Sequence, residues 1–209
     1  MHQQSAQKGI VAHPVLIAAA IIGLLIIFLY AIGALKFDLT VKKSSQGTSS
    51  SATTSQSKTY QNDQVGISLN FPASWRYQEK PNKDTVVGFL SPLGKDDQFA
   101  ENVIVRIVDL SSNPSLTLQE GVDLWIEQTK GSYSTGDFAV VSQAPATVAS
   151  MPARRVVFLL KDQGIEGKGM ATITIQNNTA YIFVYLAETK SFDKFLSDAN
   201  SIVASLKIK

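Results

Sequence analysis

The chain has 209 residues and a formal net charge of +2, with 44% apolar and 17% charged residues. It contains no cysteine, and both histidines precede residue 14. This excludes disulfides, thiolate metal sites, a cysteine nucleophile and histidine-based catalysis over most of the chain. Residues 1–59 carry five lysines and one aspartate, whereas residues 60–209 carry 14 basic and 16 acidic side chains. Because the second part lacks a basic stripe, we expect no nucleic-acid partner.

An uncharged apolar run from Val15 to Leu35 predicts a membrane-spanning helix. As a helix, its 21 residues would extend about 32 Å, which matches the ~30 Å hydrocarbon core of a bilayer. We therefore expect residues 1–14 to form a short tail and residues 15–35 to lie in the lipid bilayer.

Two alternatives to a retained anchor remain open. Ala31-Ile32-Gly33 is a passable cleavage site for a secretory signal, although the apolar run is longer than such signals usually have. Lys8-Gly9, followed by Ile10 and the apolar run, resembles the start of an archaeal type IV prepilin, which would be cleaved after Gly9. We favour an uncleaved single-pass anchor.

Residues 36–59 are predicted to be a flexible linker. Eleven of the sixteen residues in 44–59 are Ser or Thr, and such a segment cannot bury enough apolar surface to fold. The 24-residue tether would reach about 27 Å. One lysine before the helix and three after it favour a cytoplasmic C-terminus. However, the Ser/Thr-rich tract is typical of an external stalk, and we give this more weight than the lysine count. We therefore expect a cell-membrane protein with its C-terminal domain outside the cytoplasm.

Residues 60–209 are predicted to form one α+β domain. Ile67, Leu69 and Phe71 alternate with polar residues, together with Val65, as in a half-buried strand. Further strands are expected near residues 84–90, 102–110, 138–148, 153–161, 168–176 and 180–187, the last three as an antiparallel meander.

Several of these strands are apolar on both faces, which predicts that both faces of the sheet are covered. One covering helix should begin with the capping box Thr117-Leu118-Gln119-Glu120, and the other near Ser191. The expected fold is an antiparallel sheet with helices on both faces, an α/β/α sandwich that follows one transmembrane helix.

Several segments of this domain resemble the PsbP-related domain. They are Tyr60, Gly66–Trp75 (GISLNFPASW), Leu116–Glu120 at a helix start, Tyr181, and Ser205-Leu206-Lys207-Ile208. The resemblance implies a Mog1/PsbP-like sandwich. Plant members are lumenal subunits of photosystem II that support calcium and chloride retention, whereas membrane-anchored bacterial and archaeal relatives mostly lack an assigned activity. The domain has no histidine and no recognisable photosystem-binding segment, so the photosystem role is not carried over.

Candidate metal or phosphate sites are few. Asp96, Asp97 and Glu101 offer oxygen ligands of the kind that Ca²⁺ takes, and the resemblance also brings calcium into consideration. The spacing of a calcium-binding loop is missing, so we expect a solvated acidic loop and no bound metal or cofactor. Gly167-Lys168-Gly169 is a fragment of a phosphate loop, but a strand follows it, and we reject that interpretation.

Four other residues are candidates for contact or modification. Tyr133 is flanked by small residues and is expected to be exposed, as a partner contact. Arg154 and Arg155 could bind an anionic partner, but alternation along a strand puts them on opposite faces. Asn177 opens an Asn-Asn-Thr glycosylation sequence at an expected hairpin tip.

The sequence therefore predicts a non-enzymatic accessory domain on a membrane anchor, which docks on or stabilises a membrane or envelope protein complex. Two alternatives stay open. One is a pilin-like structural subunit processed after Gly9. The other is a small-ligand carrier or an enzyme that uses carboxylates.

Overall fold

The computed structural model describes residues 56–80, 85–94, 99–162 and 164–209. The predicted membrane helix at 15–35 and most of the predicted linker lie outside these residues. Within them, no helix is long and apolar enough to cross a membrane. The first strand begins at Ser57, so the last three residues of the expected linker already pair in a sheet.

The larger of two sheets has seven antiparallel strands in the order β3-β4-β5-β9-β8-β7-β6. They are β3 (Arg76–Glu79), β4 (Val87–Leu90), β5 (Asn102–Asp109), β6 (Phe138–Val148), β7 (Met151–Asp162), β8 (Ile165–Gln176) and β9 (Thr179–Glu188). The predicted meander of the last three is confirmed by the pairing of β7 with β8 and β8 with β9. The sequence did not predict β3, because this short edge strand is mostly polar and carries no alternating pattern.

A second, smaller sheet consists of β1 (Ser57–Asn62), β2 (Ile67–Pro72) and β10 (Lys207–Ile208), with β2 in the middle. Ile67 and the two alternate residues after it are buried as expected, but Val65 lies in the turn before the strand and is 37% exposed. Gly66 has a φ of 66° in that turn, a conformation that glycine adopts without steric cost. The strand predicted at 65–71 thus belongs to a separate sheet that also binds the C-terminus.

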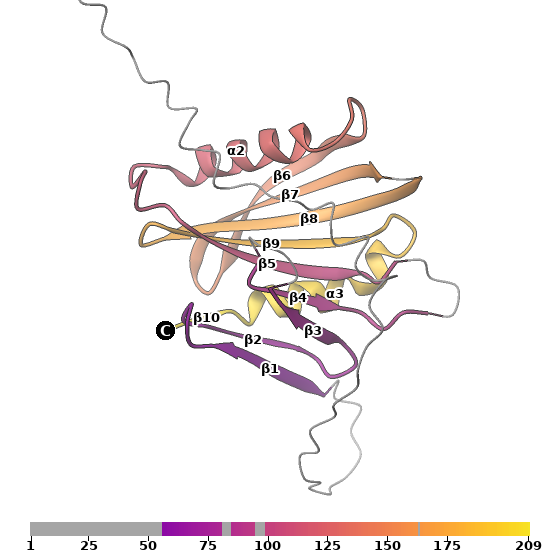
Figure 1. Ribbon diagram of the computed structural model, residues 1–209, viewed down its shortest axis with the longest axis horizontal. Helices are drawn as coiled ribbons and strands as arrows, with labels where there is room; N and C mark the ends of the chain where they lie inside the picture. The colour runs from indigo at the N-terminus through magenta and orange to yellow at the C-terminus, as the bar shows by residue number, and fades with distance from the viewer. Residues whose placement is uncertain (1–55, 81–84, 95–98, 163) are drawn as a thin grey trace, which may run out of the picture.

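Two helices, α2 (Leu118–Gly131) and α3 (Phe192–Ala204), cover opposite faces of the seven-stranded sheet. Strand β9 shows this directly, because Phe183 and Tyr185 pack in the core beneath α3, whereas Ile182 and Val184 pack in the core beneath α2. In Figure 1, α2 lies along β6, β7 and β8, and α3 lies between the seven-stranded sheet and the small sheet. The prediction of helices on both faces is confirmed.

Helix α2 begins where the sequence predicts it. The Thr117 side chain accepts a hydrogen bond from the Glu120 backbone, and the Glu120 carboxylate accepts one from the Thr117 backbone at 2.8 Å. This reciprocal capping box satisfies two N–H groups that a helix start otherwise leaves unpaired. Gly121 then brings the helix close to the sheet, since a Cβ there would lie 3.1 Å from Cδ1 of Ile175.

The two glycines of the rejected phosphate loop have a packing role in β8. A Cβ on Gly169 would overlap the ring of Phe158, and a Cβ on Gly167 would lie 2.9 Å from Cδ1 of Leu160. Phe158 in turn packs on Trp125 of α2, with ring centroids 5.6 Å apart. The glycines therefore make room for large apolar side chains of the neighbouring strand beneath α2.

Candidate docking face

Glu101 differs from its expected environment. It is only 2% exposed, just before β5, and its Oε2 accepts a hydrogen bond from the Ser91 hydroxyl at 2.7 Å. The prediction of a solvated loop is wrong for Glu101, because it immediately precedes β5 and is buried with the start of that strand. Asp96 and Asp97 lie outside the described residues. Across the described part of the chain, no group of three His, Cys, Asp or Glu side chains could hold a metal ion.

Tyr133 is not the exposed aromatic that the sequence predicted. Its ring stacks on Phe138 with centroids 6.0 Å apart and joins the core beneath α2. Burial, with a smaller contribution from the charge of Asp162, raises the pKa of Tyr133 to about 12. The neighbours of Tyr133 in sequence are small, but its packing partner comes from the next strand. Among the described aromatic residues, the exposed one is Tyr77 of β3, at 50%.

Asn177 lies at the tip of the β8–β9 hairpin, as expected. Asn177 and Asn178 form its two-residue turn, with φ values of 49° and 56°, and both are exposed. Asparagine tolerates this left-handed conformation, which matches the twist of the paired strands. Glycosylation at Asn177 stays a prediction.

Arg154 and Arg155 lie on opposite faces of β7, as their alternation predicts. Arg154 shares a face of β7 with Val156, which packs in the core beneath α2. Arg155 shares the other face with Ala153, which packs in the core beneath α3. Nη2 of Arg155 donates a hydrogen bond to Oδ1 of Asn200 in α3 at 3.3 Å. Only Arg155 can therefore act with groups of the α3 face.

The α3 face of the sheet is covered unevenly. Helix α3 packs on β2, β5, β8 and β9, and the sheet continues past it to β7 and the edge strand β6. Register partners run across this edge in rows, one of which is Ala144 of β6, Arg155 of β7 and Thr172 of β8. On β6 the part of this face beyond α3 presents Ala139, Ser142 and Ala144, which are small and exposed, whereas Ala146 and Val148 farther along the strand pack in the core beneath α3. We call the part formed by Ala139, Ser142, Ala144, Arg155, Val157 and Leu159 the uncovered face.

Exposed apolar side chains gather at this edge of the molecule. Val141 is 57% exposed at an irregularity in the β6–β7 pairing, and Leu159 on the uncovered face is 41% exposed. Val140 is also exposed, but it pairs with Phe158 and lies on the opposite face of the sheet. Strand β6 has eleven residues and no charged side chain, whereas edge strands commonly carry charges that prevent pairing with other chains. Val141 and Leu159 are therefore candidates for contact with another molecule.

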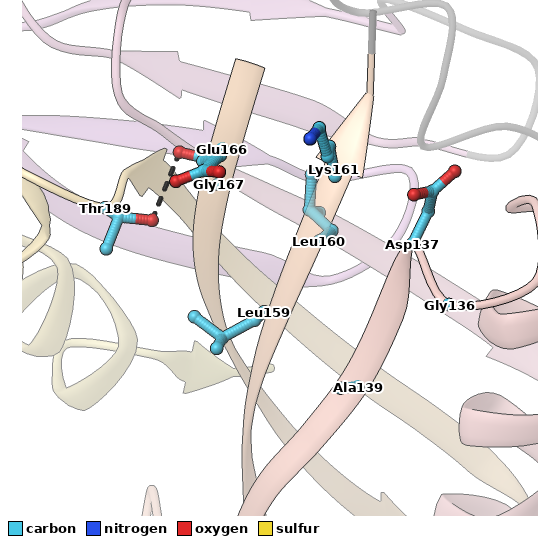
Figure 2. Close-up of a pocket in the computed structure, with 9 residues that line it drawn as sticks. All are labelled: Gly136, Asp137, Ala139, Leu159, Leu160, Lys161, Glu166, Gly167 and Thr189. Carbon is cyan, nitrogen blue, oxygen red and sulfur yellow. Dashed lines mark hydrogen bonds between the residues drawn. The ribbon is translucent and has the colours of Figure 1, made fainter. Parts of the chain in front are cut away.

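A cavity of about 320 Å³ lies at the Leu159 end of the uncovered face. Figure 2 shows Ala139 of β6 and Leu159 of β7 in the lining of this cavity, with Asp137, Lys161 and Glu166 around one end. The hydroxyl of Thr189 donates to the backbone oxygen of Glu166 at 3.1 Å, which ties the end of β9 to β8. An apolar floor with charged groups at its rim is the arrangement found in protein interfaces.

A second cavity, of about 420 Å³, lies between the β1–β2 turn and the end of β5. It is lined by Lys80, Arg106 and Asp109 among others. The Asp109 carboxylate already accepts two hydrogen bonds from Ser111, at 2.8 and 2.5 Å, and these lower its pKa. The carboxylate of Asp109 is thus engaged in a local turn. We therefore take the uncovered face as the stronger candidate for a functional site.

Comparison with known proteins supports the fold. No family model matches the chain, and no curated protein matches it. Among solved structures, cyanobacterial PsbP (CyanoP) from Synechocystis sp. PCC 6803 is similar, with a TM-score of 0.57 and 15% identity over 78% of this chain and 98% of that one. LpqN, involved in cell envelope biogenesis of Mycobacterium tuberculosis, gives a TM-score of 0.54 and 14% identity over 74% and 91%. PA94 from Pseudomonas aeruginosa, a protein of unknown function, gives 0.53 and 10% over 73% and 97%.

The described residues thus form an α+β domain with a mostly antiparallel sheet and two helices. More particularly, the fold is PsbP-like. At these identities the likeness concerns the fold alone. The sequence had singled out Arg155 at the uncovered face but not Val141 or Leu159. A signal for Val141 was present in the neutral run 138–148, which is unusual for an edge strand, but this run does not include Leu159.

Proposed function

We propose that this protein is a non-catalytic accessory protein, held at the outer side of the cell membrane by residues 15–35, whose PsbP-like domain docks on another membrane or envelope protein through the uncovered face. The observation that carries the proposal is the exposed apolar edge formed by Val141 and Leu159 beside a cavity with a charged rim. LpqN, a protein of similar fold, is involved in cell envelope biogenesis, which is consistent with a role at the envelope.

The docking surface is tested by placing a charge in its apolar part. We expect Leu159→Asp and Val141→Asp to abolish co-purification of a stoichiometric partner from mild detergent, because a carboxylate would have to be desolvated in the interface. Val65→Asp is the matched control, since Val65 is also exposed but lies in the β1–β2 turn. A full-length chain that purifies alone and monodisperse, or variants that all retain the partner, would contradict the proposal.

The membrane location is tested separately. Protease added to intact cells should cleave within residues 44–59 if the domain lies outside, and should leave the chain intact if it lies in the cytoplasm. N-terminal sequencing of the membrane form distinguishes the retained anchor from processing, because a pilin-like subunit would begin at Ile10. A mature chain that begins after Leu35 would contradict the anchor.

A further inference from the structure

We propose that Arg155 is the anchor of the uncovered face and binds the carboxylate of an Asp or Glu side chain in an extended segment of the partner protein. The inference rests on the proposed docking function and specifies the chemistry of the partner. In this arrangement the contact between Arg155 and the carboxylate is the single polar contact at the apolar edge, and it fixes the position of the partner segment along the strand.

The hydrogen bonding of Arg155 is incomplete. Its guanidinium carries five N–H donors, and the acceptor it has among the described residues is the neutral Oδ1 of Asn200, at 3.3 Å. Nε is enclosed without a partner in the described structure. The hydroxyl of Thr172, opposite Arg155 in the register, is likewise buried without a partner. The guanidinium thus carries a partly buried charge with unused donors, and a carboxylate brought to its outer nitrogens would supply the counter-charge.

No carboxylate among the described residues forms an ion pair with Arg155, although Asp193 lies two turns before Asn200 and therefore on the same side of α3. Strand β6 has no charged residue, and β8 has none between Met170 and Gln176. Asp198 of α3 lies two residues before Asn200, which puts it on the opposite side of the helix, where it accepts from Trp75. The ion pairs found among the described residues are Lys190–Glu188 and Lys209–Asp63, and neither involves Arg155. The counter-charge is therefore expected from outside the domain.

The surroundings favour a carboxylate over a phosphate. Nη2 is held by Asn200 and Nε is enclosed, so Nη1 and the second hydrogen of Nη2 are the donors left for a partner, and two adjacent donors match the two oxygens of one carboxylate. A phosphate, with nearly two charges, usually gathers several cations, whereas the cavity at the end of this face adds Asp137 and Glu166 to its one lysine.

The strand spacing further specifies the partner. Arg155 and Leu159 are four residues apart on one strand, so their side chains lie on the same face about 13 Å from each other. An extended segment along β7 would place an acidic residue at Arg155 and an apolar residue four positions away at Leu159. The small side chains Ala139, Ser142 and Ala144 leave room for such a segment beside α3.

The probe for this inference is the fluorescein-labelled peptide Glu-Ser-Val-Ser-Leu with blocked ends, measured by fluorescence polarisation against the full chain in mild detergent. We expect binding at millimolar peptide or better, and a loss of about tenfold or more when its Glu is replaced by Gln, since a charge-assisted hydrogen bond contributes about 1.5–3 kcal/mol. Arg155→Gln should abolish the difference between the two peptides. Arg154→Gln, one residue away on the other face, should preserve it.

Four results would overturn the inference: no measurable binding of the glutamate peptide, equal binding of the two peptides, equal effects of the two arginine variants, or tighter binding of a phosphoserine peptide than of the glutamate peptide. If Arg155→Gln does not fold, Arg155→Lys decides. It keeps the charge and the aliphatic stem but lacks the fork, and a several-fold weaker affinity for the glutamate peptide is expected.

The same variants separate this inference from the docking function. If Arg155→Gln releases the co-purified partner and Arg154→Gln retains it, both are supported. If Leu159→Asp releases the partner while Arg155→Gln retains it, the docking face stands and the carboxylate contact is wrong. If all of these variants retain the partner, the docking face itself is wrong.

Discussion

The indole N–H of Trp75 donates a hydrogen bond to Oδ2 of Asp198 at 3.2 Å, across 123 residues of sequence. Trp75 lies just before β3 and is buried, and its ring also meets Phe195 of α3 edge-on, at 6.1 Å between centroids. This contact connects the segment between β2 and β3 to helix α3. It also keeps Asp198 on the side of α3 that faces away from Arg155.

Removing this bond should weaken the attachment of α3. We expect Trp75→Phe to lower the free energy of unfolding by about 1–3 kcal/mol, because it leaves a partly buried carboxylate without its donor and also removes apolar volume. The double-mutant cycle with Asp198→Ala, which removes the acceptor, isolates the hydrogen bond, and urea unfolding measures each variant. A coupling energy of zero would show that the bond does not contribute to stability.

The close approach of Gly169 to Phe158 predicts a second stability effect. Gly169→Ala should lower the free energy of unfolding by about 1–3 kcal/mol, because the added methyl group overlaps the Phe158 ring and forces the core beneath α2 to shift. Gly131→Ala is the matched control. No atom lies near its Cβ position in α2, and alanine there should leave stability unchanged or raise it by up to about 1 kcal/mol. Equal effects of the two substitutions would contradict this explanation.

The capping box of α2 predicts a third effect on stability. Thr117→Ala should lower the free energy of unfolding by about 1 kcal/mol, because the Glu120 backbone N–H loses its acceptor at the helix start. Thr117→Ser keeps the hydroxyl and should stay close to wild type. Thermal unfolding followed by circular dichroism compares the two variants, and a serine variant as unstable as the alanine variant would contradict the capping role.

The environment of Tyr133 predicts a loss of stability in alkali. Burial raises its pKa from 10.0 to about 12 in the folded protein. Below pH 10 the phenol is protonated in both states, so it adds no pH dependence. Between pH 10 and 12 the unfolded chain loses this proton while the folded chain keeps it, so the free energy of unfolding falls with rising pH, by about 2–3 kcal/mol in total.

The measurement for Tyr133 is urea unfolding at a series of pH values from 9 to 12. Tyr133→Phe removes the phenol and should flatten this part of the profile. Other tyrosines with raised pKa, such as Tyr181, keep a residual slope in both proteins. A profile in Tyr133→Phe as steep as that of the wild type would contradict the assignment.

Much of the domain follows from local patterns. The capping box gives the start of α2, and the paired asparagines give the turn between β8 and β9. The strands that are apolar on both faces require a covering layer on each side of the sheet, and Ser191 marks the start of the helix that provides one of them. These features depend on residues close together in the chain, so their physical basis can be read from the sequence.

Other features depend on contacts between distant segments, and only the tertiary structure decided them. Phe138 covers Tyr133, and β5 carries Glu101 into the core, although the neighbours of both residues in sequence suggest exposure. The small sheet takes its third strand from the C-terminus, where β10 pairs with β2. The uncovered face exists because α3 packs mainly on β9, β5 and β8 in the middle of the sheet. Local alternation places Arg155 on a face, but only the packed positions of α3 and its neighbours show which groups that face contains.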